Sequence, residues 1–216
     1  MFYWIKTSQT IKWLFKRQIW SIHNPGNKIY LTFDDGPTPE VTEWVLNILK
    51  EENIKATFFC IGKNIEHHPD IFQKVAQQGH IIGNHTFNHL NGWKTKTSTY
   101  LKNIKQCEDL IHTNLDKTTL KLFRPPYGKI TPRQEKKLRK LGYKIIMWDI
   151  LTADFDTTIS IEKCLKNATD KVENGSIIVF HDSLKARKNL EYALPKAIKV
   201  LKDKGFVFDT IQSDYI

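Results

Sequence analysis

The stretch KIYLTFDDGPTPE at residues 28–40 carries the first unit of the predicted fold. Its residues 29–33 form an apolar, β-rich run that ends in two adjacent acids, Asp34 and Asp35, before a Gly36–Pro37 break. Apolar residues at helical spacing follow the break, so the stretch predicts a buried strand, a turn and a helix. Two carboxylates at the end of a buried strand either lie in solvent or hold a positively charged group.

The alternation of strand and helix continues along the chain. Expected strands lie at residues 29–33, 56–61, 80–84, 120–124, 143–150, 176–182 and 205–211. Expected helices lie at residues 38–53, from Pro69 to a stop at Gly79, and at 97–113, 131–141, 158–173 and 189–204. Repeated βα units imply parallel strands with right-handed crossovers. The residues alone therefore predict an α/β fold, either an open doubly wound sheet or a barrel of TIM type.

The composition is that of one soluble globular domain. The chain has 216 residues, of which 40% are hydrophobic and 26% charged, and domains commonly span ~100–200 residues. The three cysteines have no paired spacing, so we expect Cys60, Cys107 and Cys164 to be buried apolar residues without disulfides.

The net charge of +10 permits contact with an anionic polymer or membrane but selects neither. The densest basic run, residues 133–140, is predicted to be an exposed helix face, because the other lysines are dispersed. The sequence contains no recognised nucleic-acid-binding motif, so we expect no specific nucleic-acid partner.

Residues 1–27 are predicted to be a helical, aromatic extension preceding a main domain at 28–216. The extension lacks the continuous apolar run of a cleavable signal peptide, and its Lys and Arg residues interrupt any bilayer-spanning segment. Either it packs Trp13, Leu14, Ile19 and Trp20 on the domain, or it makes weak peripheral contact with a membrane. The extension alone favours a cytoplasmic or membrane-peripheral location.

Polar side chains gather where five of the predicted strands end. They are Asp34 and Asp35, His85 and His89, Arg124, Asp149 and Asp154, and His181 and Asp182. Ligands of parallel α/β folds bind at the carboxyl ends of the strands. The sequence therefore predicts that these groups share one rim.

The sequence HTFNH at residues 85–89 places two imidazoles at i and i+4, which share one face on a helical turn. Alone, the pair is either a metal site or two hydrogen-bonded surface histidines. Together with Asp35, His85 and His89 offer three nitrogen and oxygen ligands with one position left open. That pattern is typical of a catalytic site for zinc or a similar divalent ion.

The remaining charged groups suit acid–base chemistry. Asp34, beside the predicted ion, suits a general base that Arg124 would keep ionised and oriented. His181 suits a general acid on the far side. The structural alternatives are an ion-pairing Arg124 and a strand-end His181 without a catalytic role.

Five motifs in order resemble those of the polysaccharide deacetylases, the NodB-homology family or carbohydrate esterase family 4. They are TFDDGP at 32–37, HTFNH at 85–89, RPPYG at 124–128, WDILTADF at 148–155 and VFH at 179–181. The resemblance covers about residues 28–210. It implies a distorted (β/α) barrel of about seven parallel strands and a metal-dependent hydrolase that removes acetyl groups from sugar polymers or oligomers.

The resemblance also implies roles for single residues. Asp34 matches the catalytic base and Arg124 the arginine that orients it. Asp35, His85 and His89 match the metal ligands, with zinc favoured over cobalt, manganese or nickel. His181 matches the catalytic acid, the backbone N–H of Tyr127 a donor to the oxyanion, and Asp154 a group that orients Arg124 or His181. Pro126, Trp148 and Val179 match the substrate-binding positions, the last two around the acetyl methyl group.

Two departures from the family pattern bear on the substrate. The fourth motif usually reads D-x-x-D-W, but here Leu151 replaces the first acid and Phe155 the tryptophan, and Val179 replaces the usual leucine of the fifth. The resemblance favours N-deacetylation of N-acetylglucosamine units in peptidoglycan or chitooligosaccharide by a monomer, at the cell envelope. The alternatives are O-deacetylation of acetylated xylan and a catalytically silent carbohydrate-binding relative.

Overall fold

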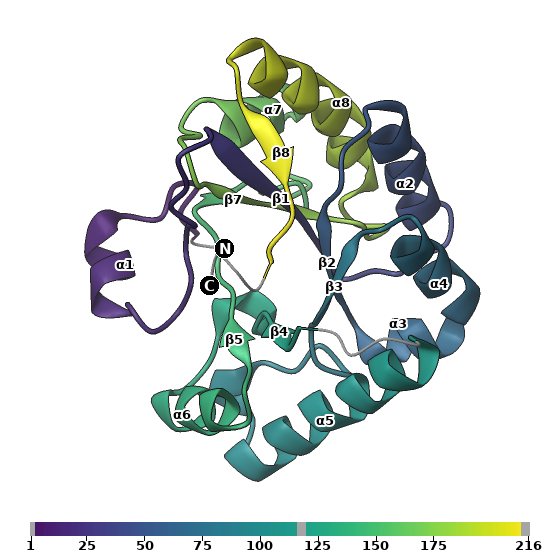
Figure 1. Cartoon of the computed structure of the whole chain (residues 1–216), viewed down its shortest axis with the longest axis vertical. Helices are drawn as coiled ribbons and strands as arrows, with labels where there is room; N and C mark the ends of the chain where they lie inside the picture. The colour runs from purple at the N-terminus through teal and green to yellow at the C-terminus, as the bar shows by residue number, and fades with distance from the viewer. Residues whose placement is uncertain (1–2, 116–119, 213–216) are drawn as a thin grey trace.

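The computed structural model describes residues 3–115 and 120–212, so the predicted bounds at residues 1 and 216 lie outside the described residues. A single parallel sheet curls around the middle of the molecule, and helices ring its outer side (Figure 1). Its strand order is β5-β4-β3-β2-β1-β7-β6, with β8 paired to β1, and each of these pairings is parallel. The predicted distorted α/β barrel is confirmed.

The strands follow the predicted order, and most are shorter than predicted. They are β1 Lys28–Asp34, β2 Thr57–Cys60, β3 Ile81–Asn84, β4 Leu122–Phe123, β5 Lys144–Ile145, β6 Ile150–Leu151, β7 Ile177–His181 and β8 Val207–Asp209. The α-helices are α1 Gln9–Leu14, α2 Val41–Glu51, α3 Gly62–His67, α4 Pro69–Gln77, α5 Thr97–Asn114, α6 Pro132–Lys140, α7 Ile161–Thr169 and α8 Arg187–Asp203. Helix α3 was not predicted from the sequence.

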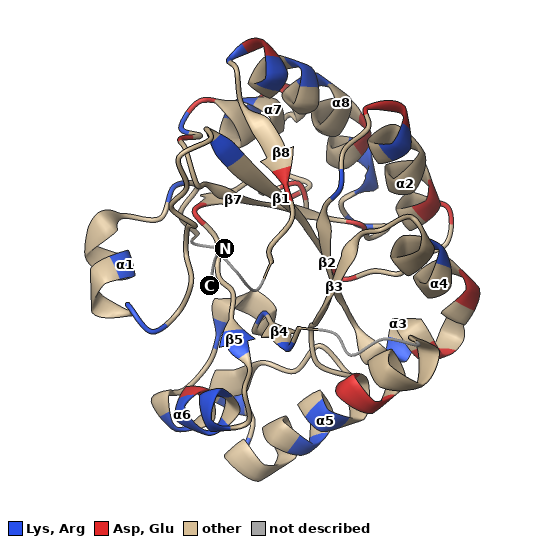
Figure 2. Cartoon of the chain, viewed as in Figure 1, with Lys and Arg blue, Asp and Glu red and all other residues tan. Residues whose placement is uncertain are grey.

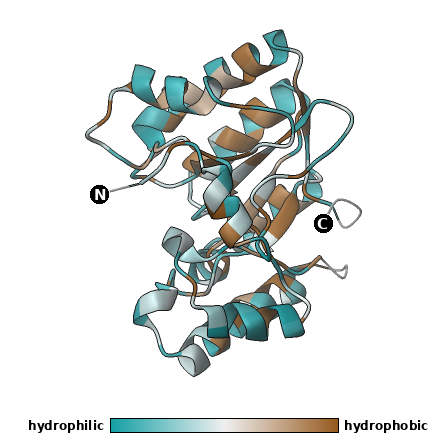
Figure 3. Ribbon diagram, turned by 90° about the vertical axis from the view of Figure 1, so that its left-hand side faces the viewer, coloured by the Kyte–Doolittle hydropathy of each residue, from teal (hydrophilic) through white to brown (hydrophobic). Residues whose placement is uncertain are grey.

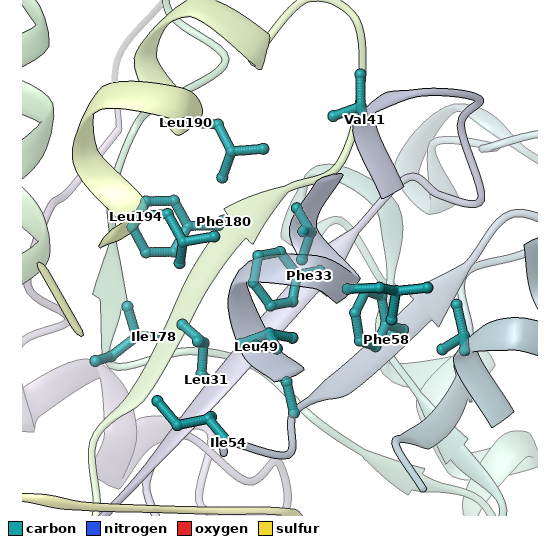
Figure 4. Packing of buried hydrophobic residues seen from close by; sticks show 14 of the residues in the cluster. Leu31, Phe33, Val41, Leu49, Ile54, Phe58, Ile178, Phe180, Leu190 and Leu194 are labelled. Carbon is teal, nitrogen blue, oxygen red and sulfur yellow. The ribbon is translucent and has the colours of Figure 1, made fainter. Parts of the chain in front are cut away.

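Strand β1 lies between β2 and β7, and its side chains alternate between the two faces of the sheet. Leu31 and Phe33 pack outward against the helices, whereas Thr32 and Asp34 lie on the inner side. Figure 4 shows this outer core, in which Leu49, Phe58, Ile178, Phe180, Leu190 and Leu194 surround the β1 residues. The large apolar cluster therefore fixes which face of β1 points into the barrel.

The predicted strand at residues 143–150 is wrong as a single element. It forms β5 at one edge of the sheet and β6 at the opposite edge, with residues 146–149 crossing between them. The carbonyls of Ile146 and Met147 accept hydrogen bonds from the Arg124 side chain at 3.4 and 2.9 Å. These two carbonyls are thus hydrogen-bonded to a buried guanidinium, whereas in a continuous strand they would pair with a neighbouring strand.

The N-terminal segment fills the opening between these two edges. Lys6 forms an antiparallel bridge with Ile150, and Ile19 a parallel bridge with Ile146. The buried Asp149 carboxylate forms ion pairs with the ammonium groups of Lys6 and Lys12, each at 2.6 Å. Its expected place at the rim is therefore wrong, because its carboxylate is drawn to the lysines of the N-terminal segment.

Of the four N-terminal residues that could pack on the domain, only two do so. Ile19 and Trp20 are partly buried against core clusters. Trp13 and Leu14, at the end of the six-residue helix α1, are instead 74% and 64% exposed. The helix projects from the body of the molecule (Figure 1), so these two side chains have no core to enter. The division at residue 27 stays a prediction.

The other expectations from composition concern the surface and the cysteines. Cys60, Cys107 and Cys164 are buried and free, as predicted. Lys and Arg residues spread over α5, α6 and α8 (Figure 2), and the predicted basic face of α6 is exposed. Apolar residues gather along the strands and the inner sides of the helices (Figure 3). Among the described residues, no helix combines the length and apolar composition needed to cross a bilayer.

Candidate metal centre and its acid–base partners

A turn after β1 brings Asp34 and Asp35 to the same rim, although strand neighbours normally face opposite sides. Asp35 has a φ of 84°, which redirects the chain directly after the strand. The Gly36 N–H then donates to the Asp182 carboxylate at 3.0 Å, and a Cβ at Gly36 would collide with that carboxylate. Only glycine therefore lets the turn approach β7 this closely.

Asp182 was placed at a strand end by the sequence, but no role was predicted for it. Its carboxylate also accepts a 2.6 Å hydrogen bond from the Thr42 hydroxyl, and its N–H donates to the Asp34 carbonyl at 3.1 Å. It thus holds the acidic turn between β7 and α2. The sequence offered one signal for this role, an acidic residue directly after His181.

Three predicted metal ligands converge at this rim. One oxygen of Asp35 lies 3.8 Å from His85 Nε2 and 3.3 Å from His89 Nε2, and one ligand atom from each residue lies within 4.8 Å of the others. That Asp35 oxygen is buried and accepts no hydrogen bond from any residue that the structure describes. An unpartnered buried carboxylate oxygen facing two imidazole nitrogens fits a divalent cation.

The histidine protonation states also fit a cation. His85 Nδ1 lies 2.8 Å from the Arg124 carbonyl, which can only accept, so this nitrogen carries the proton and Nε2 presents its lone pair. Burial lowers the pKa of His85, and burial with the nearby His85 lowers the pKa of His89 to about 4. Both rings are therefore neutral near pH 7, as metal ligands must be.

The two histidines come together on a loop, so the predicted helical turn is wrong. Thr86 and His89 have φ values of 64° and 54°, and residues 85–90 belong to no helix. The Asn103 side chain on α5 accepts hydrogen bonds of 3.0 Å from the N–H groups of Phe87 and Asn88. This amide replaces the bonds that a helix would supply, and sequence reasoning missed it.

Asp34 and Arg124 form a fully enclosed pair. Arg124 Nη1 donates to the Asp34 carboxylate at 2.7 Å and to the Thr32 hydroxyl at 2.8 Å. Burial alone would raise the pKa of Asp34, but the charge and hydrogen bond of Arg124, together with the nearby His85 and His181, outweigh burial, and the pKa lies below its ordinary value. The guanidinium also lies 4.1 Å from the centroid of the Phe59 ring. Asp34 is thus held ionised in a single orientation.

His181 ends β7 directly beside Asp34 in the sheet register. Its Nδ1 lies 2.7 Å from the Asp154 carboxylate, whose second oxygen accepts the His181 backbone N–H at 2.6 Å. Burial lowers the pKa of His181, but the charge and hydrogen bond of Asp154, together with the charges of Asp35 and Asp34, outweigh burial and raise the pKa to about 9. The ring is therefore a protonated donor near pH 7. Of the two residues that Asp154 was expected to orient, it contacts His181.

The substituted fourth motif contacts the same histidine. The Phe155 and His181 rings meet in an edge-to-face arrangement with their centroids 5.0 Å apart. Tyr3 packs edge-on against Phe155 at 5.6 Å and donates a 2.6 Å hydrogen bond to Asp156. The N-terminal segment thus supports the wall behind His181, which a local motif search could not reveal.

The predicted substrate-binding residues lie on two sides of the centre. Tyr127 has a φ of 60°, and its hydroxyl lies 3.0 Å from His89 Nδ1. Pro126 is buried in the same turn, and Trp148 packs so close to Gly128 that a Cβ there would lie 2.8 Å from the indole. Val179 lies two residues before His181 on β7 and is buried on the same side of the sheet.

The assembled site combines a cation-binding triad, an ionised carboxylate and a protonated imidazole. Asp34 is positioned to accept a proton, while His181 can donate one. Such a pair, next to three ligands for a divalent ion, supports hydrolysis of an amide or ester. Each predicted catalytic and metal-binding residue lies at this rim.

Comparison with known proteins gives consistent matches. A family model described as polysaccharide deacetylase matches residues 21–146. A peptidoglycan-N-acetylglucosamine deacetylase of Bacillus cereus is 35% identical over 201 residues, covering 92% of this chain and 72% of that protein. A second deacetylase of that name and organism is 31% identical over 193 residues, covering 89% and 90%. The crystal structure of the Bc1960 peptidoglycan N-acetylglucosamine deacetylase is 33% identical, covers 95% of each chain and has a TM-score of 0.87.

Proposed function

The chain belongs to the polysaccharide deacetylase family, and we propose that it removes N-acetyl groups from N-acetylglucosamine units of peptidoglycan. The observation that carries this proposal is the convergence of Asp35, His85 and His89 beside the Asp34–Arg124 pair. Two relatives named for this substrate, matched over most of the chain, support the choice of glycan. Intact ligands and acid–base groups argue against a catalytically silent relative.

Asp35, His85 and His89 would hold the divalent ion, with zinc favoured by its preference for nitrogen and oxygen ligands in an open site. When bound, the ion supplies a Lewis acid that polarises the acetyl carbonyl and favours ionisation of water. The neutral imidazoles and the unpartnered Asp35 oxygen support this choice of ligands.

The chain's own groups complete the reaction. Asp34 accepts the proton of the attacking water, because Arg124 holds its carboxylate ionised. The Tyr127 N–H donates to the developing oxyanion, a contribution worth ~10²–10³ in kcat in comparable sites. His181 donates its proton to the leaving nitrogen, while Asp154 fixes the ring. Trp148 and Val179 enclose the acetyl methyl group.

An acetate-release screen tests the proposed function. The protein, stripped by a chelator, should release no acetate from peptidoglycan until zinc or another divalent ion is restored. Cobalt, manganese and nickel are compared with zinc at matched concentrations. Preferred release from chitooligosaccharide or from acetylated xylan would reassign the substrate. Full activity of the metal-free protein would refute the assigned centre.

The N-terminal segment carries the second part of the proposal, a weak contact with an anionic membrane surface. Residues 13–17 are all exposed. They comprise three large apolar side chains, Trp13, Leu14 and Phe15, followed by the cations Lys16 and Arg17. Large apolar side chains beside basic ones fit the interface of an anionic bilayer, where rings enter the headgroup region and cations meet phosphates. This projecting patch opposes the alternative in which all of its apolar side chains pack on the domain.

We expect the wild-type protein to sediment with phosphatidylglycerol vesicles and not with phosphatidylcholine vesicles. Trp13→Ala with Leu14→Ala should weaken the binding about tenfold or more, because burying each such side chain contributes ~1.5–3 kcal/mol. Leu141→Ala removes an exposed leucine elsewhere and serves as the matched control. Equal sedimentation of all three proteins would exclude this surface.

A further inference from the structure

Trp93 carries an exposed but fixed indole four residues after His89. It is 63% exposed, yet its ring N–H donates a 3.1 Å hydrogen bond to the Ile130 carbonyl. The Lys129 ammonium lies 3.8 Å from the centroid of the ring. A large aromatic side chain that is held in place but left in water indicates a binding surface more than a packing element.

The turn under Trp93 is rigid. The Gly92 N–H donates to the Lys129 carbonyl at 3.1 Å, and a Cβ at Gly92 would collide with that carbonyl. The Gln134 side chain on α6 donates to the carbonyls of Gly92 and Thr95 at 2.9 and 3.1 Å. These bonds lock the position of the indole before any ligand arrives, which lowers the entropic cost of binding.

The two chain segments that carry Trp93 and Lys129 also contact each other at the metal centre. Segment 89–95 carries His89 and Trp93, and segment 126–130 carries Tyr127 and Lys129. His89 Nδ1 lies 3.0 Å from the Tyr127 hydroxyl, with ring centroids 4.5 Å apart. Tyr127 is itself 51% exposed. The segments thus run from the cation site outward to the Trp93–Lys129 pair along one side of the rim.

Phe87 lies between His85 and His89 in the sequence, but it cannot form part of an aromatic surface for sugars. Its side chain is buried in the outer core. The ring packs against Gly62, where an added Cβ would lie 2.7 Å from it. Trp93 and Tyr127, unlike Phe87, are exposed and can reach a glycan.

We propose that Trp93 and Lys129 form a subsite for a pyranose ring next to the deacetylated one, with Lys129 binding a carboxylate on the glycan. This subsite rests on the proposed function. The C–H face of a pyranose is apolar and suits stacking on an exposed indole such as that of Trp93. The Lys129 ammonium, 3.8 Å from the ring centroid, supplies a charge for an acidic substituent. The subsite would favour an anionic strand over a neutral one.

Chain-length dependence tests the role of Trp93. The ratio of kcat/KM for an N-acetylglucosamine pentamer to that for the dimer should fall about fivefold in Trp93→Ala, mainly through KM, since one stacked ring is worth ~1 kcal/mol. Trp93→Tyr should keep most of the ratio. Trp13→Ala removes another exposed indole, on α1, and should keep the wild-type ratio. An unchanged ratio in Trp93→Ala would overturn the subsite.

Lys129 is tested by substrate charge. Lys129→Gln should lower kcat/KM about threefold to tenfold on peptidoglycan strands with free carboxylates, relative to the neutral pentamer, and added salt should shrink this difference. An equal effect on both substrates would refute the proposed contact between Lys129 and a carboxylate of the glycan.

A binding assay separates failure of the subsite from failure of the proposed reaction. Retention on purified peptidoglycan is measured in the Asp34→Asn background, with and without Trp93→Ala. Weaker retention of the double variant supports the subsite even if no polymer releases acetate. Equal retention refutes the subsite while leaving the deacetylase assignment to the acetate screen.

Discussion

Asp34→Asn should lower kcat for acetate release by about 10²–10⁴-fold, the usual contribution of a positioned base. The amide keeps the size of the side chain and an oxygen that can accept from Arg124 Nη1, which now lies 2.7 Å from the carboxylate. It removes the ability to accept a proton from water. The loss should appear in kcat more than in KM, because the carboxylate acts on the reacting water.

The controls for this variant concern folding and metal binding. Arg124 is fully buried, and a buried charge that loses its partner destabilises a protein by ~3–5 kcal/mol. We expect Asp34→Asn to melt below the wild type but above Asp34→Ala, because the amide retains an acceptor. Zinc content, measured on the folded protein, should persist in Asp34→Asn and fall in Asp35→Asn. Wild-type turnover in Asp34→Asn would move the base to another residue.

The sequence predicted which residues lie close together, because these residues stand at strand ends. The carboxyl ends of parallel strands meet at one edge, so Asp34, His85, Arg124 and His181 could be placed together without coordinates. Their separate motifs also resembled one family, which supplied the roles that spacing alone left open. The hydrogen-bond and packing partners that position each of these side chains could not be predicted from the sequence.

Two of the errors share one physical origin, long-range polar contacts that override local pattern. The apolar run at 143–150 predicts one strand, but the buried Arg124 guanidinium draws two of its carbonyls out of the sheet. Asp149 follows the same run, yet Lys6 and Lys12 hold it away from the rim. Neither partner lies near its target in sequence, so no local rule could find it.

The N-terminal segment shows the opposite case, in which local pattern suggested packing that the fold does not provide. Trp13 and Leu14 have helical spacing with neighbouring apolar residues, but α1 ends at Leu14 and projects from the sheet. Meanwhile Tyr3, with no motif around it, packs on Phe155 behind His181. Which apolar residues are buried depended on where the segment crosses the sheet edges.

His181→Gln should also lower kcat by about 10²–10⁴-fold, because it removes the proton donor for the leaving nitrogen. The glutamine can still hydrogen-bond to Asp154, so we expect the fold and the zinc content to remain. The defect should be largest on N-acetyl substrates, whose amine leaving group needs protonation. A phenyl acetate, whose leaving group departs without a proton, should lose much less activity and serves as the matched control. Equal losses on both substrates would assign His181 a structural role.

The pH dependence gives a separate signature of the same residue. Burial lowers the pKa of His181, but the charge and hydrogen bond of Asp154, with smaller contributions from Asp35 and Asp34, outweigh burial and raise the pKa to about 9. A proton donor works only while protonated, so activity should hold below that pKa and decline as the pH rises through about 9. Asp154→Asn removes the largest of the charges that raise the pKa, so the decline should move to lower pH. A decline that stays in place in Asp154→Asn would belong to a group other than His181.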